Sequence, residues 1–158
     1  MALVIRSPRV DELPGLSDLC FRSKAVWGYD EEFMKACRTE LSFSPQDLEL
    51  TDVAVAEEDC RTIGVVQVRI SADNAELLKL FVEPDVLRKG TGKALFAWAT
   101  DISRKLGAHR MIIEADPNAA PFYREMGARD GGTAPSRSIP GRMLPRLTLD
   151  LLRCRINP

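Results

Sequence analysis

The segment that decides the fold spans residues 80–95 and reads LFVEPDVLRKGTGKAL. Its apolar start predicts a strand that ends at Pro84, and a helix is predicted to begin directly after Gly90 and Gly92. The first N–H groups of a helix lack backbone partners and carry partial positive charge, so such a junction suits an anion. Arg88, Lys89 and Lys93 add charge, and glycines let a backbone approach a phosphate closely at positive φ. The segment predicts a phosphate site; the simpler interpretation is that the glycines only turn the chain.

Two familiar phosphate-binding patterns fail here at specific positions. A P-loop needs a glycine five residues before Gly92 and a Ser or Thr after Lys93, where the chain has Leu87 and Ala94. A dinucleotide-binding loop needs a third glycine where Leu95 stands, and it normally follows the first strand of a parallel βαβ unit. Neither nucleotide-binding class is therefore predicted.

Outward from this segment, hydrophobic periodicity predicts one mixed α/β domain over residues 1–158, with a mostly antiparallel twisted sheet flanked by helices in the order βααβββαβαββ. The predicted strands are Leu3–Arg6, Asp52–Glu57, Thr62–Ser71, Ala75–Val82, Met111–Ala115 and Leu144–Leu152, with one more near Arg129. The predicted helices run from Val10 to about Lys24, from a cap at Asp30 through Leu41, from the glycine loop to Leu106, and over Ala119–Met126. The hairpin turn is expected at Asp73–Asn74. The third helix is expected to bury Leu95, Trp98, Ala99, Ile102 and Leu106 and to stop at Gly107.

Composition argues against several classes of function. Lys and Arg number 22 against 23 Asp and Glu, and the net charge of −1 leaves no basic stripe for a nucleic acid. No apolar stretch approaches the about 18 residues of a membrane span, so we expect no membrane association and a cytoplasmic protein. Cys20, Cys37, Cys60 and Cys154 form no CxxC pair and His109 is the single histidine, so we expect free, buried or half-buried thiols and no metal.

A second segment, residues 113–128, reads IEADPNAAPFYREMGA. Val82-x-Pro84 with Gly90-x-Gly92-x-x-Leu95, followed by this strand, its Asn-Ala start and its FYxxxG helix, resembles the GNAT superfamily of N-acetyltransferases in order, spacing and position. The resemblance covers residues 62–128 well. One position departs from the family pattern: Leu87 stands where Gln or Arg is usual, and Arg88 is displaced by one place.

The resemblance implies an acetyl-CoA-dependent enzyme that passes the acetyl group directly to a primary amine of a small molecule in a ternary complex. It places the pyrophosphate of acetyl-CoA on Leu87, Arg88, Lys89, Gly90, Thr91, Gly92 and Lys93. The strand backbone of Leu80, Phe81 and Val82 would hold the pantetheine arm and the oxyanion. Asn118, Phe122 and Tyr123 would complete the cofactor site. A protein or peptide acceptor and a non-catalytic acyl-CoA sensor are the alternatives.

Two side chains are candidate catalysts by the same resemblance. Tyr123 matches the position of the general acid that protonates the CoA thiolate, although a tyrosine there can also simply pack on its helix. Glu76 matches an acidic position used as a base, with Glu114 or a water chain as alternatives. The expected hairpin register puts Glu76 diagonal to Arg69, so a salt bridge is the competing interpretation. Asn118 either supports the cofactor or caps the helix at Ala119.

The acceptor site is expected between residues 23–29 and residues 136–142. Trp27 and Tyr29 could form an aromatic wall there, with Glu114 as a further substrate contact. Trp27 could equally be ordinary packing between two helices. A homodimer is possible.

Overall fold

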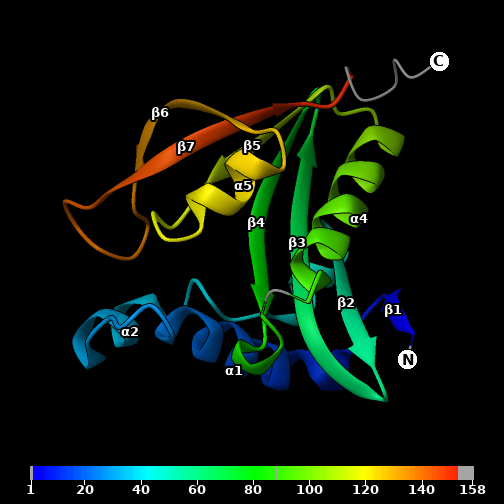
Figure 1. Ribbon diagram of the computed structural model, residues 1–158, viewed down its shortest axis with the longest axis vertical. Coiled ribbons are helices and arrows are strands. Elements are labelled where there is room, and N and C mark those ends of the chain that lie inside the picture. The colour runs from blue at the N-terminus through cyan, green and yellow to red at the C-terminus, as the bar shows by residue number, and fades with distance from the viewer. Residues whose placement is uncertain (1, 88, 153–158) are drawn as a thin grey trace.

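The computed structural model describes residues 2–87 and 89–152, which form one sheet with helices on both of its faces (Figure 1). The strands are β1 (Leu3–Arg6), β2 (Asp52–Glu58), β3 (Arg61–Ser71), β4 (Asn74–Val82), β5 (Arg110–Glu114), β6 (Arg129–Pro135) and β7 (Met143–Asp150). The helices are α1 (Leu13–Ala25), α2 (Glu31–Cys37), α3 (Pro45–Leu50), α4 (Thr91–Lys105) and α5 (Ala120–Glu125), with short 3-10 turns η1 (Val10–Glu12) and η2 (Pro84–Val86).

The described residues build a seven-stranded sheet in the order β1-β2-β3-β4-β5-β7-β6. Neighbouring strands are antiparallel except β4 and β5, which pair in parallel. The expected fold class, a mixed and mostly antiparallel sheet flanked by helices, is confirmed. One helix was missed, α3, although Ser44 and Asp47 form a capping box ahead of Pro45 at its first turn.

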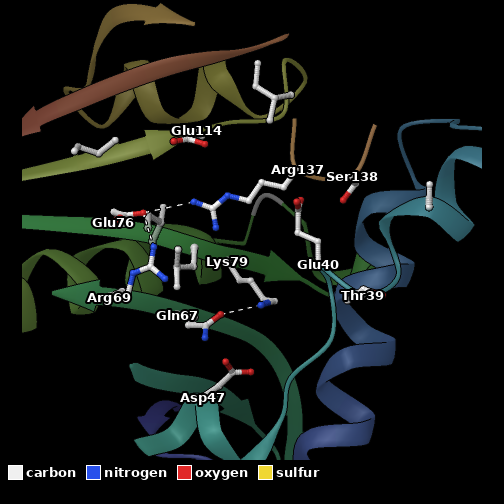
Figure 2. Close-up of a pocket in the computed structure, with 15 residues that line it drawn as sticks. Thr39, Glu40, Asp47, Gln67, Arg69, Glu76, Lys79, Glu114, Arg137 and Ser138 are labelled. Atoms are coloured by element: carbon white, nitrogen blue, oxygen red, sulfur yellow. Dashed lines mark hydrogen bonds and ion pairs between the residues drawn. The ribbon is translucent and has the colours of Figure 1, made fainter. Parts of the chain in front are cut away.

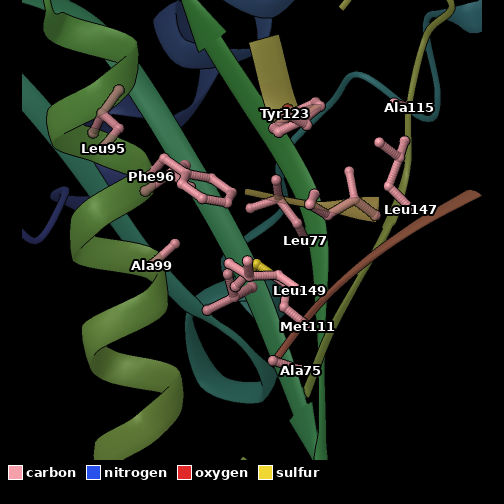
Figure 3. Close-up of a cluster of buried hydrophobic side chains, with 14 of the residues drawn as sticks. Ala75, Leu77, Leu95, Phe96, Ala99, Met111, Ala115, Tyr123, Leu147 and Leu149 are labelled. Carbon is pink, nitrogen blue, oxygen red and sulfur yellow. The ribbon is translucent and has the colours of Figure 1, made fainter. Parts of the chain in front are cut away.

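The sheet is covered on both faces because apolar residues occupy both sides of its central strands. Along β2, Val53 and Val55 join a cluster with α1 and α2, whereas Ala54 and Ala56 join the cluster under α4 and α5. Successive strand residues point to opposite faces, so such continuous apolar runs need two cover layers. Figure 3 shows the second cluster, with Leu95, Phe96 and Ala99 of α4 facing Leu77 of β4.

The buried face of α4 differs from the expected one. Trp98 and Ile102 are only partly buried and Leu106 is 51% exposed, whereas Phe96, Thr100 and Ser103 are buried. The buried hydroxyls are tolerated because each donates a hydrogen bond within the helix, Ser103 to the Ala99 carbonyl at 2.7 Å and Thr100 to that of Ala97 at 3.0 Å. A helix face that is predicted from apolar residues alone misses buried polar residues such as Thr100 and Ser103.

The β3–β4 hairpin turns one residue earlier than expected. Ser71 pairs with Asn74, so the turn residues are Ala72 and Asp73, with Ala72 at φ 53°. This register sets Val68 opposite Leu77, and both side chains are buried in the cluster under α4. A turn at Asp73–Asn74 would instead set Val68 opposite Lys79. Pairing two apolar side chains outweighs the strain at Ala72.

Near the middle of β4, the side chains switch faces of the sheet and the pairing with β5 ends. Gln67 pairs with Lys79 and Val68 with Leu77, so Leu78 is an extra residue on β4, a β-bulge. Before the bulge Ala75 and Leu77 face α4, and after it Leu80 and Val82 do. The parallel pairing with β5 also ends here, at Leu77 opposite Ile113. Beyond that point the two strands diverge, and this opening positions the candidate site.

No helix among the described residues is long and apolar enough to cross a membrane.

Candidate acyl-CoA and amine site

The glycine loop joins the end of β4 to the start of α4. Gly90 is the N-cap residue of α4 and has φ 86°, a left-handed conformation that favours glycine. Gly92 lies in the first turn of the helix without a positive φ, so the expectation of positive φ at both glycines is wrong for Gly92. A Cβ atom on Gly92 would lie 3.6 Å from Phe122, at ordinary contact distance. The loop therefore presents the N–H groups at the N-terminus of a fifteen-residue helix to an anion.

The side chains of the loop contribute unequally. Lys89 and Lys93 are exposed and free to approach a phosphate, and Leu87 is 43% exposed. The Thr91 side chain is buried, with its methyl group 3.3 Å from where a Gly64 Cβ would lie, so only its backbone can face an anion. Arg88, the displaced basic residue, lies outside the described residues.

Tyr123 lies inside the core rather than on the surface. Its ring contacts Phe96 and Phe122, with centroids 5.7 and 5.2 Å away, and Figure 3 shows it beside β4. Burial raises the pKa of its phenol above the ordinary value of 10.0. No hydrogen bond joins its hydroxyl to any residue within 2–87 or 89–152. The phenol is thus protonated at neutral pH and its proton is not committed elsewhere in the described chain.

A pocket of about 480 Å³ opens on the other face of β3, β4 and β5, where β4 and β5 diverge. Leu77, Leu78 and Lys79 of β4 line it together with Ile112 and Glu114 of β5. Residues after α2 (Thr39, Glu40), Asp47 of α3, and Arg137 and Ser138 between β6 and β7 close its sides (Figure 2). Beyond Leu77, the β4 amides that point away from β3 have no strand partner within residues 2–87 and 89–152. Such unpaired amides can bind an oxyanion or an amide of a ligand.

Glu76 faces this pocket but is already paired. It stands directly opposite Arg69, not diagonal to it, because of the shifted turn. Arg69 donates a hydrogen bond to the Glu76 carboxylate at 2.9 Å, and Arg137 lies 3.9 Å from the same oxygen. The competing salt-bridge interpretation is confirmed. The Glu76 oxygen that could accept a proton is thus already engaged by guanidinium groups.

Glu114 is the pocket carboxylate nearest the divergence. It is the next residue of β5 after Ile113, the last one paired with β4, and it is exposed on the pocket face. In the part of the chain that the structure describes, it makes no ion pair. Figure 2 shows its carboxylate directed along the pocket rim above Glu76.

Tyr29 and Asn118 belong to a polar bridge next to the pocket. The Tyr29 hydroxyl donates to Asp116 at 2.7 Å and accepts from Arg142 at 2.8 Å and from Asn118 at 3.1 Å. Burial alone would raise the pKa of Asp116, but the Tyr29 hydroxyl, the Asn118 N–H and the Lys24 ammonium together lower it. The bridge ties the α1–α2 connection to the β5–α5 and β6–β7 connections.

Tyr29, Trp27 and Asn118 make contacts that the sequence did not indicate. Tyr29 stacks on Phe33 with centroids 4.0 Å apart and does not line the pocket of about 480 Å³. Trp27 is 45% exposed and also lies outside that lining, so the aromatic wall stays a prediction. Asn118 does not cap α5, whose N-cap residue is Ala119; its amide instead bonds Tyr29 and Asp116.

The thiols and possible metal ligands add no further chemistry to the site. Cys20 and Cys37 are buried free thiols, as expected, but Cys60 is exposed, and Cys154 lies outside the described residues. Burial raises the pKa of Cys20 to about 12, which suppresses its thiolate. Among the described residues, no group of three or more His, Cys, Asp or Glu side chains could hold a metal ion.

Sequence reasoning missed most of the pocket's lining. Arg137 and Ser138 lie in the expected segment 136–142, but Gln67 and Lys79 were not singled out. Lys79 is a charged residue within an apolar strand, a signal that could have been noticed. The direction of the Lys79 side chain depends on the bulge at Leu78, which the sequence pattern does not predict.

Comparison with known proteins agrees with this geometry. Residues 22–133 match the model of the acetyltransferase (GNAT) domain family. The chain belongs to the GNAT acetyltransferases. Spermidine N(1)-acetyltransferase of Thermoplasma acidophilum is 27% identical over 121 residues, which are 68% of this chain and 74% of that protein.

Solved GNAT structures share the fold over nearly the whole chain. The PaiA N-acetyltransferase of Thermoplasma acidophilum, solved with coenzyme A, superposes with a TM-score of 0.77 at 20% identity, over 95% of this chain and 99% of that one. A GCN5-related N-acetyltransferase of Rhodopseudomonas palustris gives 0.78 at 17% identity, over 95% and 96%. The protein is thus an acetyl-CoA-dependent N-acetyltransferase of the GNAT type.

Proposed function

We propose that this GNAT protein acetylates a primary amine of a small molecule by direct transfer in a ternary complex. The observation that carries the proposal is the pocket of about 480 Å³, which opens at the divergence of β4 and β5 and is lined by charged side chains. Its volume falls within the range of small-molecule sites. The named relative whose acceptor is the small amine spermidine supports the same substrate class.

Acetyl-CoA would lie with its pyrophosphate at the N-terminus of α4 and its thioester at the opening between the strands. Gly90 allows the turn into α4, and Lys89 and Lys93 supply exposed positive charge. The backbone of Leu80, Phe81 and Val82 lies beyond the last β4–β5 pair, where it can bind the pantetheine arm. Phe122 faces Gly92 and closes the loop from the α5 side.

In the transfer step, the amine nitrogen attacks the thioester carbonyl carbon and its C–S bond breaks. The oxyanion formed on the way is stabilised by β4 amides without strand partners. Tyr123 donates its proton to the departing thiolate, and because its pKa is raised the phenol carries this proton at neutral pH. The proton lost by the amine goes to Glu114, the pocket carboxylate closest to the divergence. Glu76 positions Arg69 and Arg137 instead.

The test is an amine panel with thiol release as the readout, supplemented by a short peptide with a free amino terminus. We expect turnover with small amines and, when both substrates are varied, intersecting double-reciprocal lines. Parallel lines would overturn direct transfer. Turnover of the peptide alone would overturn the small-molecule acceptor, and CoA binding without turnover of any amine would indicate a sensor. The cytoplasmic location and the possible homodimer stay predictions.

A further inference from the structure

The wall of the acceptor pocket contains a half-buried lysine, Lys79, that the catalytic scheme does not use. Its ammonium donates one hydrogen bond, to Gln67 Oε1 at 2.9 Å, and its nitrogen lies 4.7 Å from the centre of the Phe43 ring. Gln67 is 1% exposed, and its amide nitrogen donates in turn to the Thr51 hydroxyl at 3.1 Å. The lysine is therefore held in place by a buried amide and an aromatic ring, not loose on the surface.

This ammonium has no carboxylate partner within the described residues. Asp47 and Glu40 are the carboxylates whose charges act on the Lys79 ammonium. The Asp47 carboxylate is engaged at the start of α3, where it accepts the Ser44 N–H at 2.8 Å, and Glu40 is exposed at the rim. Burial lowers the pKa of Lys79, and the charges of Asp47 and Glu40 offset this effect only in part.

An ammonium has three donors, so two remain after the bond to Gln67. A half-buried cation with spare donors gains most from an anionic group, because the charge-assisted hydrogen bonds offset its lost hydration. A second cation placed beside it would be repelled. A polyamine such as spermidine, which carries only positive groups, offers Lys79 no such partner.

The charges of the pocket lining divide into paired and unpaired groups. Glu114 lies on β5 where the strands diverge, and Lys79 lies on β4 three residues beyond Glu76, with the Arg137 guanidinium between them in Figure 2. Among the described lining residues that make no ion pair, Lys79 is the only cation, and Glu114, Glu40 and Asp47 are the carboxylates. Arg69 and Arg137 both form ion pairs with Glu76.

We propose that Lys79 binds a carboxylate of the acceptor, so that the preferred acceptors are small amino-carboxylates such as amino acids. The acceptor amine then points to Glu114 and the β4–β5 divergence. The inference rests on the proposed function, since it assigns the acceptor class of the same site.

The first experiment compares acceptors that differ only by a carboxylate. L-lysine is set against cadaverine, L-ornithine against putrescine and L-leucine against isoamylamine, with spermidine included, and kcat and KM are measured for each. We expect the carboxylate member of at least one pair to have a KM lower by roughly ten- to a hundred-fold, as for a charge-assisted hydrogen bond. Equal constants within every pair, or a preference for spermidine, would overturn the inference.

The second experiment replaces the ammonium while keeping the volume of the side chain. Lys79→Met should raise KM for the carboxylate acceptor by about the same factor and leave its carboxylate-free partner unchanged, and Lys79→Arg should keep the preference. Lys35→Met, on an exposed position of α2 outside the pocket lining, is the matched control and should change neither. An equal loss for both members of a pair would show a structural role and overturn the inference.

Failure of the inference and of the proposed function can be told apart. If amines are acetylated without preference for acceptors that carry a carboxylate, only the proposed role of Lys79 is refuted. If the protein and Lys79→Met both bind CoA in calorimetry and no small amine is acetylated, the proposed function falls and the inference with it.

Discussion

Gly64 of β3 lies directly beneath Leu95 of α4, so closely that a Cβ atom at position 64 would come within 2.8 Å of the Leu95 Cδ1 atom. Leu95 has no exposed surface, and the Thr91 methyl would lie 3.3 Å away on the same side. The missing side chain lets α4 approach the sheet closely and sets the helix N-terminus beside the end of β4. A packing detail of the core thereby positions the pyrophosphate loop.

Replacing Gly64 by alanine should lower the free energy of unfolding, by ~1–3 kcal/mol as in other overpacked cores. Urea denaturation measures the change. Gly15→Ala is the matched control, because no described atom outside its own helical turn lies within 4 Å of a Cβ at this position. This substitution should stabilise the protein by up to ~1 kcal/mol. Equal effects of the two substitutions would contradict the close approach of α4.

The two loop glycines should respond differently to alanine. Gly90→Ala forces a side chain into a left-handed conformation at φ 86°, a strain of roughly 1–2 kcal/mol, and should weaken CoA binding about tenfold. Gly92→Ala adds a methyl at ordinary contact distance from Phe122 and Val82, so any loss of affinity reports its closeness to the bound phosphate. Calorimetry with CoA measures both. Unchanged affinity in Gly90→Ala and in bulkier variants at either glycine would place the phosphates elsewhere.

Lowering the pH should remove the stabilisation that the pairing of Arg6 with Glu12 gives to the folded protein. Arg6 donates hydrogen bonds of 2.8 Å to both Glu12 oxygens, and these bonds lower the pKa of Glu12 from 4.5 to about 2. Because the folded pKa is lowered, the stabilisation is present above pH 4.5 and is lost as the pH falls toward 2. Denaturation curves of the wild type and Glu12→Gln should therefore converge over this range. Arg6→Met should remove the same dependence, and parallel curves would refute the assignment.

The elements that local signals predicted well are those whose ends are set by single residues. Asp30 caps α2 by accepting the Phe33 N–H at 2.8 Å, and Gly107 and Gly127 follow α4 and α5 at positive φ, as their positions indicate. These residues are predictable because each ends or begins a helix through contacts with residues close to it in the sequence. The family resemblance predicted Phe122 in the cofactor site, and its ring lies beside Gly92 of the glycine loop.

The acceptor pocket was not predictable in the same way because it depends on long-range register. The bulge at Leu78 turns Lys79 toward the pocket, and the earlier turn at Ala72 sets Glu76 directly against Arg69. Both features follow from pairing apolar residues across strands, a tertiary preference that overrides the local Asp73–Asn74 turn signal. The 45% exposure of Trp27 was unpredictable for a related reason: an aromatic residue between two helices does not reveal which side faces solvent.

Tyr123→Phe should lower kcat by roughly ten- to a thousand-fold and leave CoA affinity nearly unchanged, because it removes the proton donor but keeps the ring among Phe96 and Phe122. The raised pKa of Tyr123 also places its ionisation above pH 10, so kcat should show no alkaline decline from this group below that pH. Steady-state kinetics across pH and calorimetry with CoA measure these effects. Unchanged turnover in the variant would remove Tyr123 from the mechanism.

Glu114 and Glu76 can be separated by matched substitutions. Glu114→Gln keeps the size of the side chain but removes the proposed proton acceptor, so kcat/KM should fall by roughly a hundred-fold or more. Glu76→Gln removes the partner of Arg69 and Arg137, and its main effect should be a smaller change in KM through the altered charge of the pocket wall. Both variants should bind CoA as the wild type does. The reverse order of effects would assign the base to Glu76, and equal small effects would favour proton transfer to water in the pocket.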